Sequence, residues 1–241
     1  MNDLFDAYSR RARLLPGAIV ALPVSLFAVV LFSSKPAWWT GAISLVGASG
    51  LTYFGTQLVR SLGTQTQKKL WESWGGAPST ALLRFACSSN ATQVARWHRL
   101  LGELCPDEHV PTEADEQADP AAADAAYGTL VGVLIAKTRD RKRFPRVFDE
   151  NCQYGFRRNL YGCRMIGLLL TTGSFAIAVA LLVARLAGWR HGPAVGIAVV
   201  GALDLVLWVA LKWTVTPSWI QEAGNAYAAR LVETVEVLTG R

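Results

Sequence analysis

The chain has 241 residues, of which only 17% are charged, and its formal net charge is +6. Its charged residues are nearly absent from four long apolar stretches, which excludes an ordinary water-soluble protein built from amphipathic helices. The positive charge does not require a nucleic-acid partner, and none is expected, because loops retained in the cytoplasm collect Lys and Arg.

The four apolar stretches predict membrane-spanning helices, since each approaches or exceeds the roughly 20 residues that cross about 30 Å of hydrocarbon. They are Leu14 to Phe32, Ala37 to Val59, Met165 to Ala184 and Ala194 to Val215. Their order predicts an all-α membrane protein. Four transmembrane helices form two hairpins, which flank a mostly helical cytoplasmic insert and are followed by a C-terminal cytoplasmic helix.

The basic residues predict the orientation. Three Arg precede the first stretch, and fourteen Lys or Arg lie between Ser61 and Arg164, against one and two in the links within the hairpins. This bias places both termini and the insert in the cytoplasm. The expected divisions are a first hairpin (1–60), the insert (61–162), a second hairpin (163–216) and a tail (217–241).

Within the insert, Asn90 is expected to cap a helix over 91–104, whose apolar residues recur at helical spacing. The segment 105–124 holds seven carboxylates, three prolines and no Lys or Arg, which predicts a flexible acidic loop. The apolar run from Tyr127 to Ala136 is too short to span a bilayer. The tail after Pro217 is expected to pack on the insert or on a second copy.

Asp204 falls near the middle of the fourth apolar stretch, where a charge costs on the order of 3 kcal/mol on insertion scales. It shares a helical stripe with Trp208 and Lys212. Two interpretations stay open. Asp204 lines a pore or carries protons, or it is a protonated side chain that joins neighbouring helices by hydrogen bonds.

Small and hydroxylated residues mark the second and third stretches. The polar set expected to line a pore or the bundle is Asp204, Lys212, Thr52, Thr56, Thr171, Thr172 and Ser174. Such residues allow close helix approach and hydrogen bonds between helices. The alternative is that they form the wall of a narrow aqueous path opposite Asp204.

Two groups predict anion binding. Six bases fall within ten residues from Lys137 to Arg146, a density that attracts anionic lipid or a nucleotide. Further on, paired Arg beside Tyr offer bidentate binding and ring stacking, or else an anchor at the membrane interface. The candidate ligand or anionic-lipid site comprises Arg157, Arg158, Tyr154, Glu150, Arg139, Arg141, Lys142 and Arg143.

Trp74–Thr80 reads WGGAPST, and Glu150–Asn159 reads ENCQYGFRRN. At these two motifs the chain resembles a group of uncharacterised bacterial four-helix membrane proteins. Its plan of two hairpins around an insert also resembles that of pore-forming effectors in bacterial defence loci. The resemblance implies a bacterial inner-membrane protein and implies no catalytic mechanism.

No catalytic motif of a hydrolase, zinc protease, P-loop enzyme or dinucleotide-binding enzyme is present, so no enzymatic activity is expected. The four cysteines and three histidines lack metal-ligand spacing, and neither a metal nor a cofactor is expected. Two functions remain as hypotheses. One is an oligomeric pore-forming or membrane-perturbing effector controlled by the insert. The other is a non-conducting anchor or sensor whose insert binds a soluble partner, a small anionic ligand or anionic lipid.

Overall fold

The computed structural model describes residues 6–32, 52–87, 90–189 and 194–240, which are helical and contain no strand. This confirms the all-α prediction. The elements are α1 (Ala7–Ser9), the π-helix η2 (Arg10–Leu14), α2 (Leu15–Phe32), α4 (Thr52–Ser73), α5 (Pro78–Leu83), α6 (Ala91–Leu104), α7 (Glu113–Ala118), α8 (Pro120–Lys137), α9 (Pro145–Gly162), α10 (Arg164–Leu186), α11 (Ala194–Trp213) and α12 (Pro217–Leu238).

The chain divides into two compact units. Unit 1 comprises Met1–Gln67 with Gly155–Trp219, and unit 2 comprises Lys68–Tyr154 with Ile220–Arg241. The C-terminal tail therefore belongs to the same compact unit as most of the insert. The tail helix α12 buries one apolar face that includes Leu231, Val232 and Val235, and this amphipathic pattern accounts for its place in a folded core.

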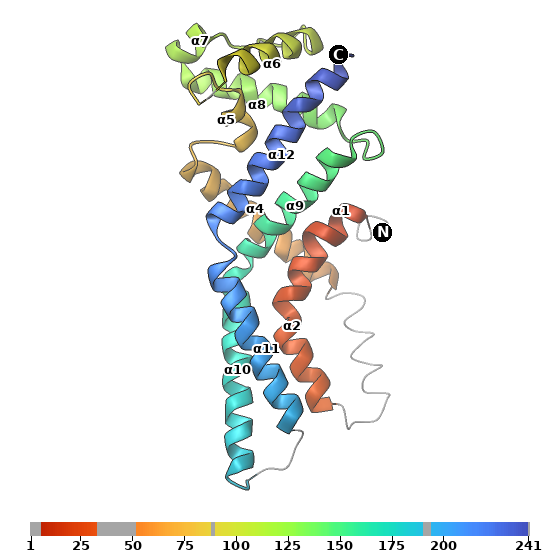
Figure 1. Cartoon of the computed structure of the whole chain (residues 1–241), viewed down its shortest axis with the longest axis vertical. Coiled ribbons are helices and arrows are strands. Elements are labelled where there is room, and N and C mark those ends of the chain that lie inside the picture. The colour runs from red at the N-terminus through yellow and green to blue at the C-terminus, as the bar shows by residue number, and fades with distance from the viewer. Residues whose placement is uncertain (1–5, 33–51, 88–89, 190–193, 241) are drawn as a thin grey trace. The chain divides into compact units, whose positions relative to one another are not determined.

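Unit 1 is a bundle in which α10 packs against both α11 and α2 (Figure 1). Three of its helical segments, Ala7–Val30, Arg164–Leu186 and Ala194–Trp213, are long and apolar enough to cross a membrane. They support a membrane protein. The fourth expected span, Ala37 to Val59, lies mostly outside the described residues.

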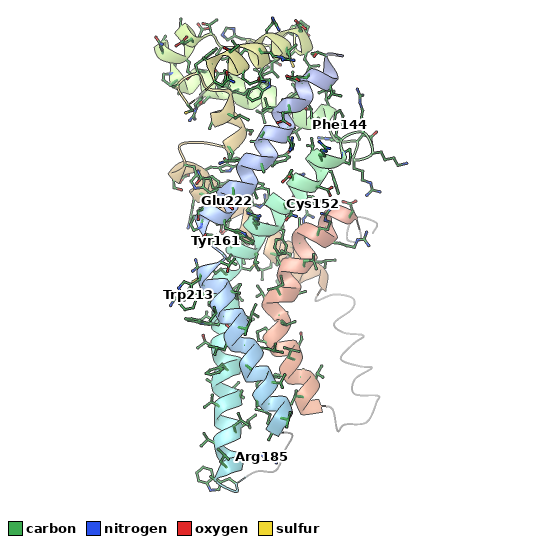
Figure 2. The ribbon with its side chains drawn as sticks, in the orientation of Figure 1. Phe144, Cys152, Tyr161, Arg185, Trp213 and Glu222 are labelled. Carbon is green, nitrogen blue, oxygen red and sulfur yellow. The ribbon has the colours of Figure 1, made fainter. Side chains whose placement is uncertain are left out.

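The membrane helices expose large apolar side chains. Leu169, Ile177 and Val183 on α10 and Val206 on α11 are all more than half exposed. Water would penalise this surface, whereas hydrocarbon does not. Arg185 and Trp213 lie at opposite ends of the α10–α11 hairpin, where charged and amphipathic side chains reach the interface (Figure 2).

Helices α4 and α9 approach each other closely within unit 1. A Cβ atom on Gly162 would lie 2.7 Å from the backbone nitrogen of Gly63, and a Cβ on Gly63 would clash with the Asn159 side chain. Only the absence of side chains at both glycines permits this crossing. The contact brings the buried Asn159 within reach of the N-terminal helix, where it donates a hydrogen bond to the Ala12 carbonyl.

Unit 2 has its own apolar core. The core residues are Leu83, Val94, Trp97, Leu100, Leu101, Cys105, Ala123, Tyr127, Leu130, Val131, Leu134, Phe144, Val147, Leu231, Val232 and Val235. They come from α5, α6, α8, α9 and α12, together with the connections between these helices. As expected, the Asn90 side chain caps α6 by accepting a hydrogen bond from the backbone N–H of Gln93.

The acidic segment 105–124 differs from the expected flexible loop. Thr112 and Asp115 form a capping box that starts α7, and Asp119 caps α8 by accepting from the N–H groups of Ala121 and Ala122. Four of the seven carboxylates, those of Glu113, Asp115, Glu116 and Asp119, thus satisfy backbone donors or sit in a first helical turn, where the helix dipole stabilises them.

All four cysteines are free thiols. Cys87 is exposed, whereas Cys105, Cys152 and Cys163 are buried. Burial raises the pKa of the Cys105 thiol, which keeps it in the unreactive protonated form. The three buried thiols therefore act as small apolar groups in the packing.

Candidate functional site: a buried carboxyl group in the membrane helices

The α10–α11 hairpin is held by small residues. A Cβ on Gly201 of α11 would lie 3.5 Å from the Cβ of Ala178 on α10, and a Cβ on Gly167 would lie 2.8 Å from Leu211. Small side chains let membrane helices approach closely. Van der Waals contacts then hold the helices together, because in lipid the hydrophobic effect does not favour their association. This packing fixes which residues of α11 face inward.

Asp204 lies on that inward face. The buried positions of α11 recur at helical spacing and are Ile197, Val200, Gly201, Asp204 and Leu211. Asp204 is only 1% exposed. It is 10 residues beyond Ala194 and 9 before Trp213 in a helix of 20 residues. The carboxyl group is therefore near the middle of the span, as the sequence predicted.

Two hydroxyl-bearing residues of α10 are buried on the same side of the hairpin, Thr171 and Ser174. The Thr171 hydroxyl is satisfied within its own helix, because it donates to the Gly167 carbonyl at 2.9 Å. Ser174 Oγ interacts with the Asp204 carboxyl group without completing a hydrogen bond. Within the described residues, neither Ser174 Oγ nor Asp204 Oδ2 has a hydrogen-bond partner.

A buried carboxyl with an unmatched oxygen has two chemical options. As a neutral acid it can donate one hydrogen bond, and as an anion it needs a cation or several donors. The described part of the chain offers no group of His, Cys, Asp and Glu side chains that could share a metal ion with it. A carboxyl group at such a position can exchange a proton, contact a passing monovalent cation or, as a neutral acid, join neighbouring helices by a hydrogen bond.

The remaining residues of the predicted polar set lie elsewhere. Lys212 is exposed, and its ammonium lies 4.6 Å from the Trp208 ring and 5.8 Å from the Trp213 ring. Thr172 is exposed and donates to the Leu168 carbonyl of its own helix. Thr56 is buried in α4, and the side chain of Thr52 lies outside the description. The structure therefore groups Asp204, Ser174 and Thr171.

The predicted ligand residues on α9 serve in packing contacts. Arg157 donates to the Trp219 carbonyl at 2.7 Å and lies 4.8 Å from the centre of the Trp219 ring. Arg158 donates to Gln67 Oε1 at 2.6 Å and to the side-chain oxygen Oδ1 of Asn159. In unit 1 these two arginines therefore connect α9 to α12 and α4 by hydrogen bonds, which is a structural role.

Tyr154 and Glu150 belong to unit 2. The Tyr154 ring stacks on Tyr227 with a centroid distance of 6.3 Å, and its hydroxyl accepts a hydrogen bond from Trp71 Nε1 at 3.1 Å. Glu150 is half-buried. Tyr154 is therefore a cross-helix packing residue that joins α4, α9 and α12.

The expected basic cluster lies on the turn between α8 and α9. Arg139, Arg141, Lys142 and Arg143 are all exposed, and the Lys142 backbone N–H donates to Asp140 at 2.8 Å. Exposed guanidinium and ammonium groups in one turn form a positive surface in unit 2.

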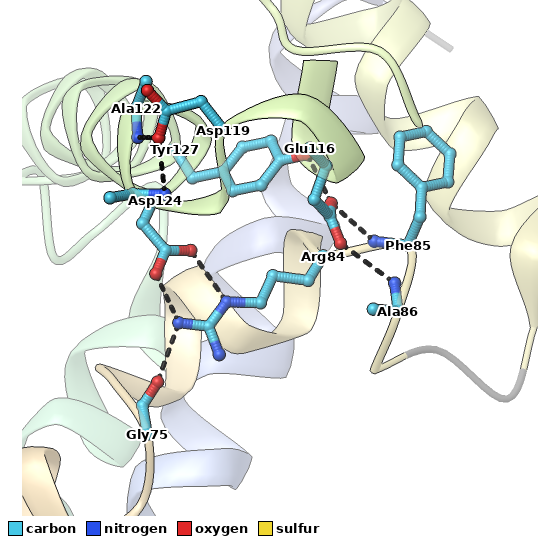
Figure 3. A network of polar contacts seen from close by, with 10 residues as sticks. Gly75, Arg84, Phe85, Ala86, Glu116, Asp119, Ala122, Asp124 and Tyr127 are labelled. Atoms are coloured by element: carbon cyan, nitrogen blue, oxygen red, sulfur yellow. Dashed lines mark hydrogen bonds and ion pairs between the residues drawn. The ribbon is translucent and has the colours of Figure 1, made fainter. Parts of the chain in front are cut away.

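Sequence reasoning missed a polar network in unit 2 (Figure 3). Arg84 donates to both carboxylate oxygens of Asp124, at 2.7 and 2.6 Å, and to the Gly75 carbonyl. Nearby, Glu116 accepts from the N–H groups of Phe85 and Ala86 and from the Tyr127 hydroxyl. Arg84 and Asp124 are 40 residues apart along the chain, and Glu116 is 30 and 31 residues from Ala86 and Phe85, so no local signal identifies these pairs.

The Trp74–Thr80 motif lies at the edge of this network. Gly75 and Gly76 have φ values of 75° and 135°, which L side chains rarely adopt, and they turn the chain between α4 and α5. The turn presents the Gly75 carbonyl to Arg84. A structural role in unit 2 thus accounts for the motif's glycines.

Comparison of the chain with protein-family models, with curated proteins and with solved structures gives no match.

Proposed function

We propose that this chain is a subunit of an oligomeric inner-membrane assembly that lets protons or small cations cross the bilayer, under the control of unit 2. The single observation that carries the proposal is the burial of Asp204 in the α10–α11 hairpin with one oxygen unmatched in the described structure. An ionisable group at that depth is expensive to insert, and such groups mark ion and proton pathways.

The proposed topology has four spans, with both termini and the basic insert in the cytoplasm. The described spans and the Lys and Arg distribution support this arrangement. The exposed apolar surface of α10 and α11 supports contact with lipid or with further copies. Several copies are needed, because four short-looped helices do not enclose a wide path.

The test is ion flux through purified protein in liposomes loaded with a pH-sensitive or K⁺-sensitive dye. Asp204→Asn keeps the shape of the side chain but cannot ionise, and it should reduce proton or cation flux at least tenfold. Thr172→Val on the exposed face of α10 is the matched control and should leave the flux unchanged.

A wild-type protein that remains a monomer in nanodiscs and carries no flux would overturn the proposal. Equal flux in wild type and Asp204→Asn would remove Asp204 from the path. Ser174→Ala separates the two roles of the carboxyl group. It should alter flux if the Ser174 hydroxyl assists the proton, and it should change only the melting temperature if the pair is structural.

A second candidate is a non-conducting anchor whose unit 2 binds a soluble partner or ligand. The observation that favours it is the self-contained apolar core of unit 2, with its own network around Arg84 and Glu116. Full-length protein that binds a cytoplasmic component and carries no ion flux would select this candidate.

A further inference from the structure

Unit 2 contains a cavity of about 280 Å³ between the start of α9 and the last turns of α12. Its lining includes the apolar residues Phe144, Val147 and Val237, which we call the floor, and the three arginines Arg143, Arg146 and Arg230. Phe144 and Val147 are buried core residues, so the floor is fixed by the packing of unit 2. The three arginines come from two segments far apart in the sequence.

The cavity carries a net positive charge. Arg230 is paired with Glu233, whose carboxylate lies 2.8 Å from Arg230 Nη1 and also lines the cavity. Arg143 and Arg146 form no ion pair with any described residue. Three guanidinium groups against one carboxylate leave a surplus of two positive charges, which favours a ligand with about two negative charges.

The start of α9 strengthens this preference. Pro145 is the first residue of an 18-residue helix, and its missing N–H costs nothing at that position. The backbone N–H groups of Arg146 and Val147 belong to the first turn, which has no α-helical acceptors for its donors. Such a helix start favours negative charge, and here it borders a cavity that already holds arginines.

From this combination we infer that the cavity is a binding site for a small phosphate-bearing ligand. Arg146 and Arg230 hold the phosphate from two sides, because the planar guanidinium group matches phosphate oxygens in a bidentate manner. The volume is just below the roughly 300 Å³ at which the usual range for ligand pockets begins, so only a phosphate with a small organic group fits. The apolar floor accommodates that organic group.

The same chemistry is offered by a soluble phosphate ester and by a phospholipid headgroup. Full-length protein is therefore reconstituted in nanodiscs of phosphatidylcholine and titrated calorimetrically with ribose 5-phosphate and with inorganic pyrophosphate. A parallel series uses nanodiscs that contain phosphatidylglycerol and no soluble phosphate, with the melting temperature of unit 2 as the readout.

Arg146→Gln and the double variant Arg230→Gln/Glu233→Gln should each weaken binding about tenfold or more, the effect of losing one charge-assisted contact. The double variant removes the ion pair as a whole and leaves no carboxylate without its partner. Arg99→Gln is the matched control, because Arg99 is exposed on α6 in the same unit and does not line the cavity. Its binding should equal that of wild type.

Saturable binding of either soluble probe with this variant pattern supports a soluble ligand. The same pattern seen only with phosphatidylglycerol supports the site with a lipid headgroup as its occupant. No binding in either series, or equal loss in Arg99→Gln, overturns the inference. Asp204→Asn should bind normally, so the site and the proposed ion path are tested separately.

Discussion

The side-chain amide of Asn159 donates a hydrogen bond of 2.6 Å to the backbone carbonyl of Ala12, 147 residues earlier in the chain. An α-helix would offer the Ala12 carbonyl the N–H of residue 16, but Pro16 has none. Asn159, which is fully buried, supplies the missing donor. Ala12 lies in the π-helix η2 (Arg10–Leu14), and its carbonyl accepts from the Asn159 side chain.

Asn159→Asp keeps the oxygen that accepts from Arg158 but removes the donor for Ala12. It should lower the free energy of unfolding by about 1–3 kcal/mol, the cost of leaving a buried acceptor unpaired. Denaturant unfolding in a mild detergent measures the change. Gln153→Ala at an exposed position of the same helix is the control and should cost much less.

Pro16→Ala provides a stricter test, because it restores the backbone donor of residue 16. In the Asn159→Asp background it should recover part of the lost stability, which makes the two substitutions non-additive. Strict additivity of the two effects would show that Pro16 and Asn159 do not share the Ala12 carbonyl.

The glycine crossing of α4 and α9 should not tolerate a methyl group. Gly162→Ala places a Cβ against the Gly63 backbone, which cannot move aside as a flexible side chain can. We expect a loss of more than about 2 kcal/mol or a failure of unit 1 to fold. Gly132→Ala on α8, where the structure leaves open space, should be neutral or stabilising and serves as control.

Arg84 should be hard to replace even by lysine. Its guanidinium forms a bidentate pair with Asp124 and also reaches the Gly75 carbonyl, a geometry that an ammonium does not reproduce. The pKa of Arg84 is raised chiefly by the hydrogen bond to Asp124. Arg84→Lys should cost about 1–2 kcal/mol, more than Arg96→Lys, whose partner Glu236 is 3.3 Å away in a more exposed pair.

Acid should destabilise unit 2 through His98. Burial lowers the pKa of His98 from its ordinary value, outweighing the hydrogen bond to the Leu83 carbonyl. The neutral ring is therefore the folded form, and stability falls as the pH drops below about 6.5, the ordinary pKa of His. Near-UV circular dichroism between pH 8 and 5 should report this loss.

His98→Gln should flatten that pH dependence, because the buried titrating ring is then absent. At lower pH a second loss follows from Glu116. Burial raises the pKa of that carboxyl, but the hydrogen bonds from Ala86, Phe85 and Tyr127 outweigh it and leave the pKa lowered. Its stabilisation is therefore present above its ordinary pKa and disappears on further acidification. Identical acid profiles for wild type and His98→Gln would contradict the assignment to His98.

Local patterns predicted much of this fold. Hydropathy predicts spans at Met165 to Ala184 and Ala194 to Val215, and the structure has helices there that are long and apolar enough to cross a membrane. Asn90 predicts the start of α6. The sequence also predicts Asp204 as a candidate site residue, because carboxylates are rare in apolar stretches of this length. These features depend only on residues within a few turns of one another.

The acidic segment 105–124 was assigned as a loop because its overall composition is polar. The local signals for helix were present, namely Thr112 with Asp115 and Asp119 before Pro120. The burial of Glu116 could not be predicted from the sequence, because its hydrogen-bond donors Phe85 and Ala86 lie about 30 residues away along the chain. The sequence predicts a ligand role for Arg157 because nothing in it places Trp219, whose carbonyl accepts the Arg157 hydrogen bond in the structure, beside that residue.

Cys87 is exposed, so its reaction with a thiol reagent reports on which side of the membrane this part of the chain lies. Three of the four thiols are shielded, so a maleimide that cannot pass through lipid will modify Cys87 first. In right-side-out vesicles the proposed orientation hides Cys87, and in inverted vesicles it becomes reactive. A single labelling reaction on the unmodified natural chain thus tells which compartment unit 2 occupies.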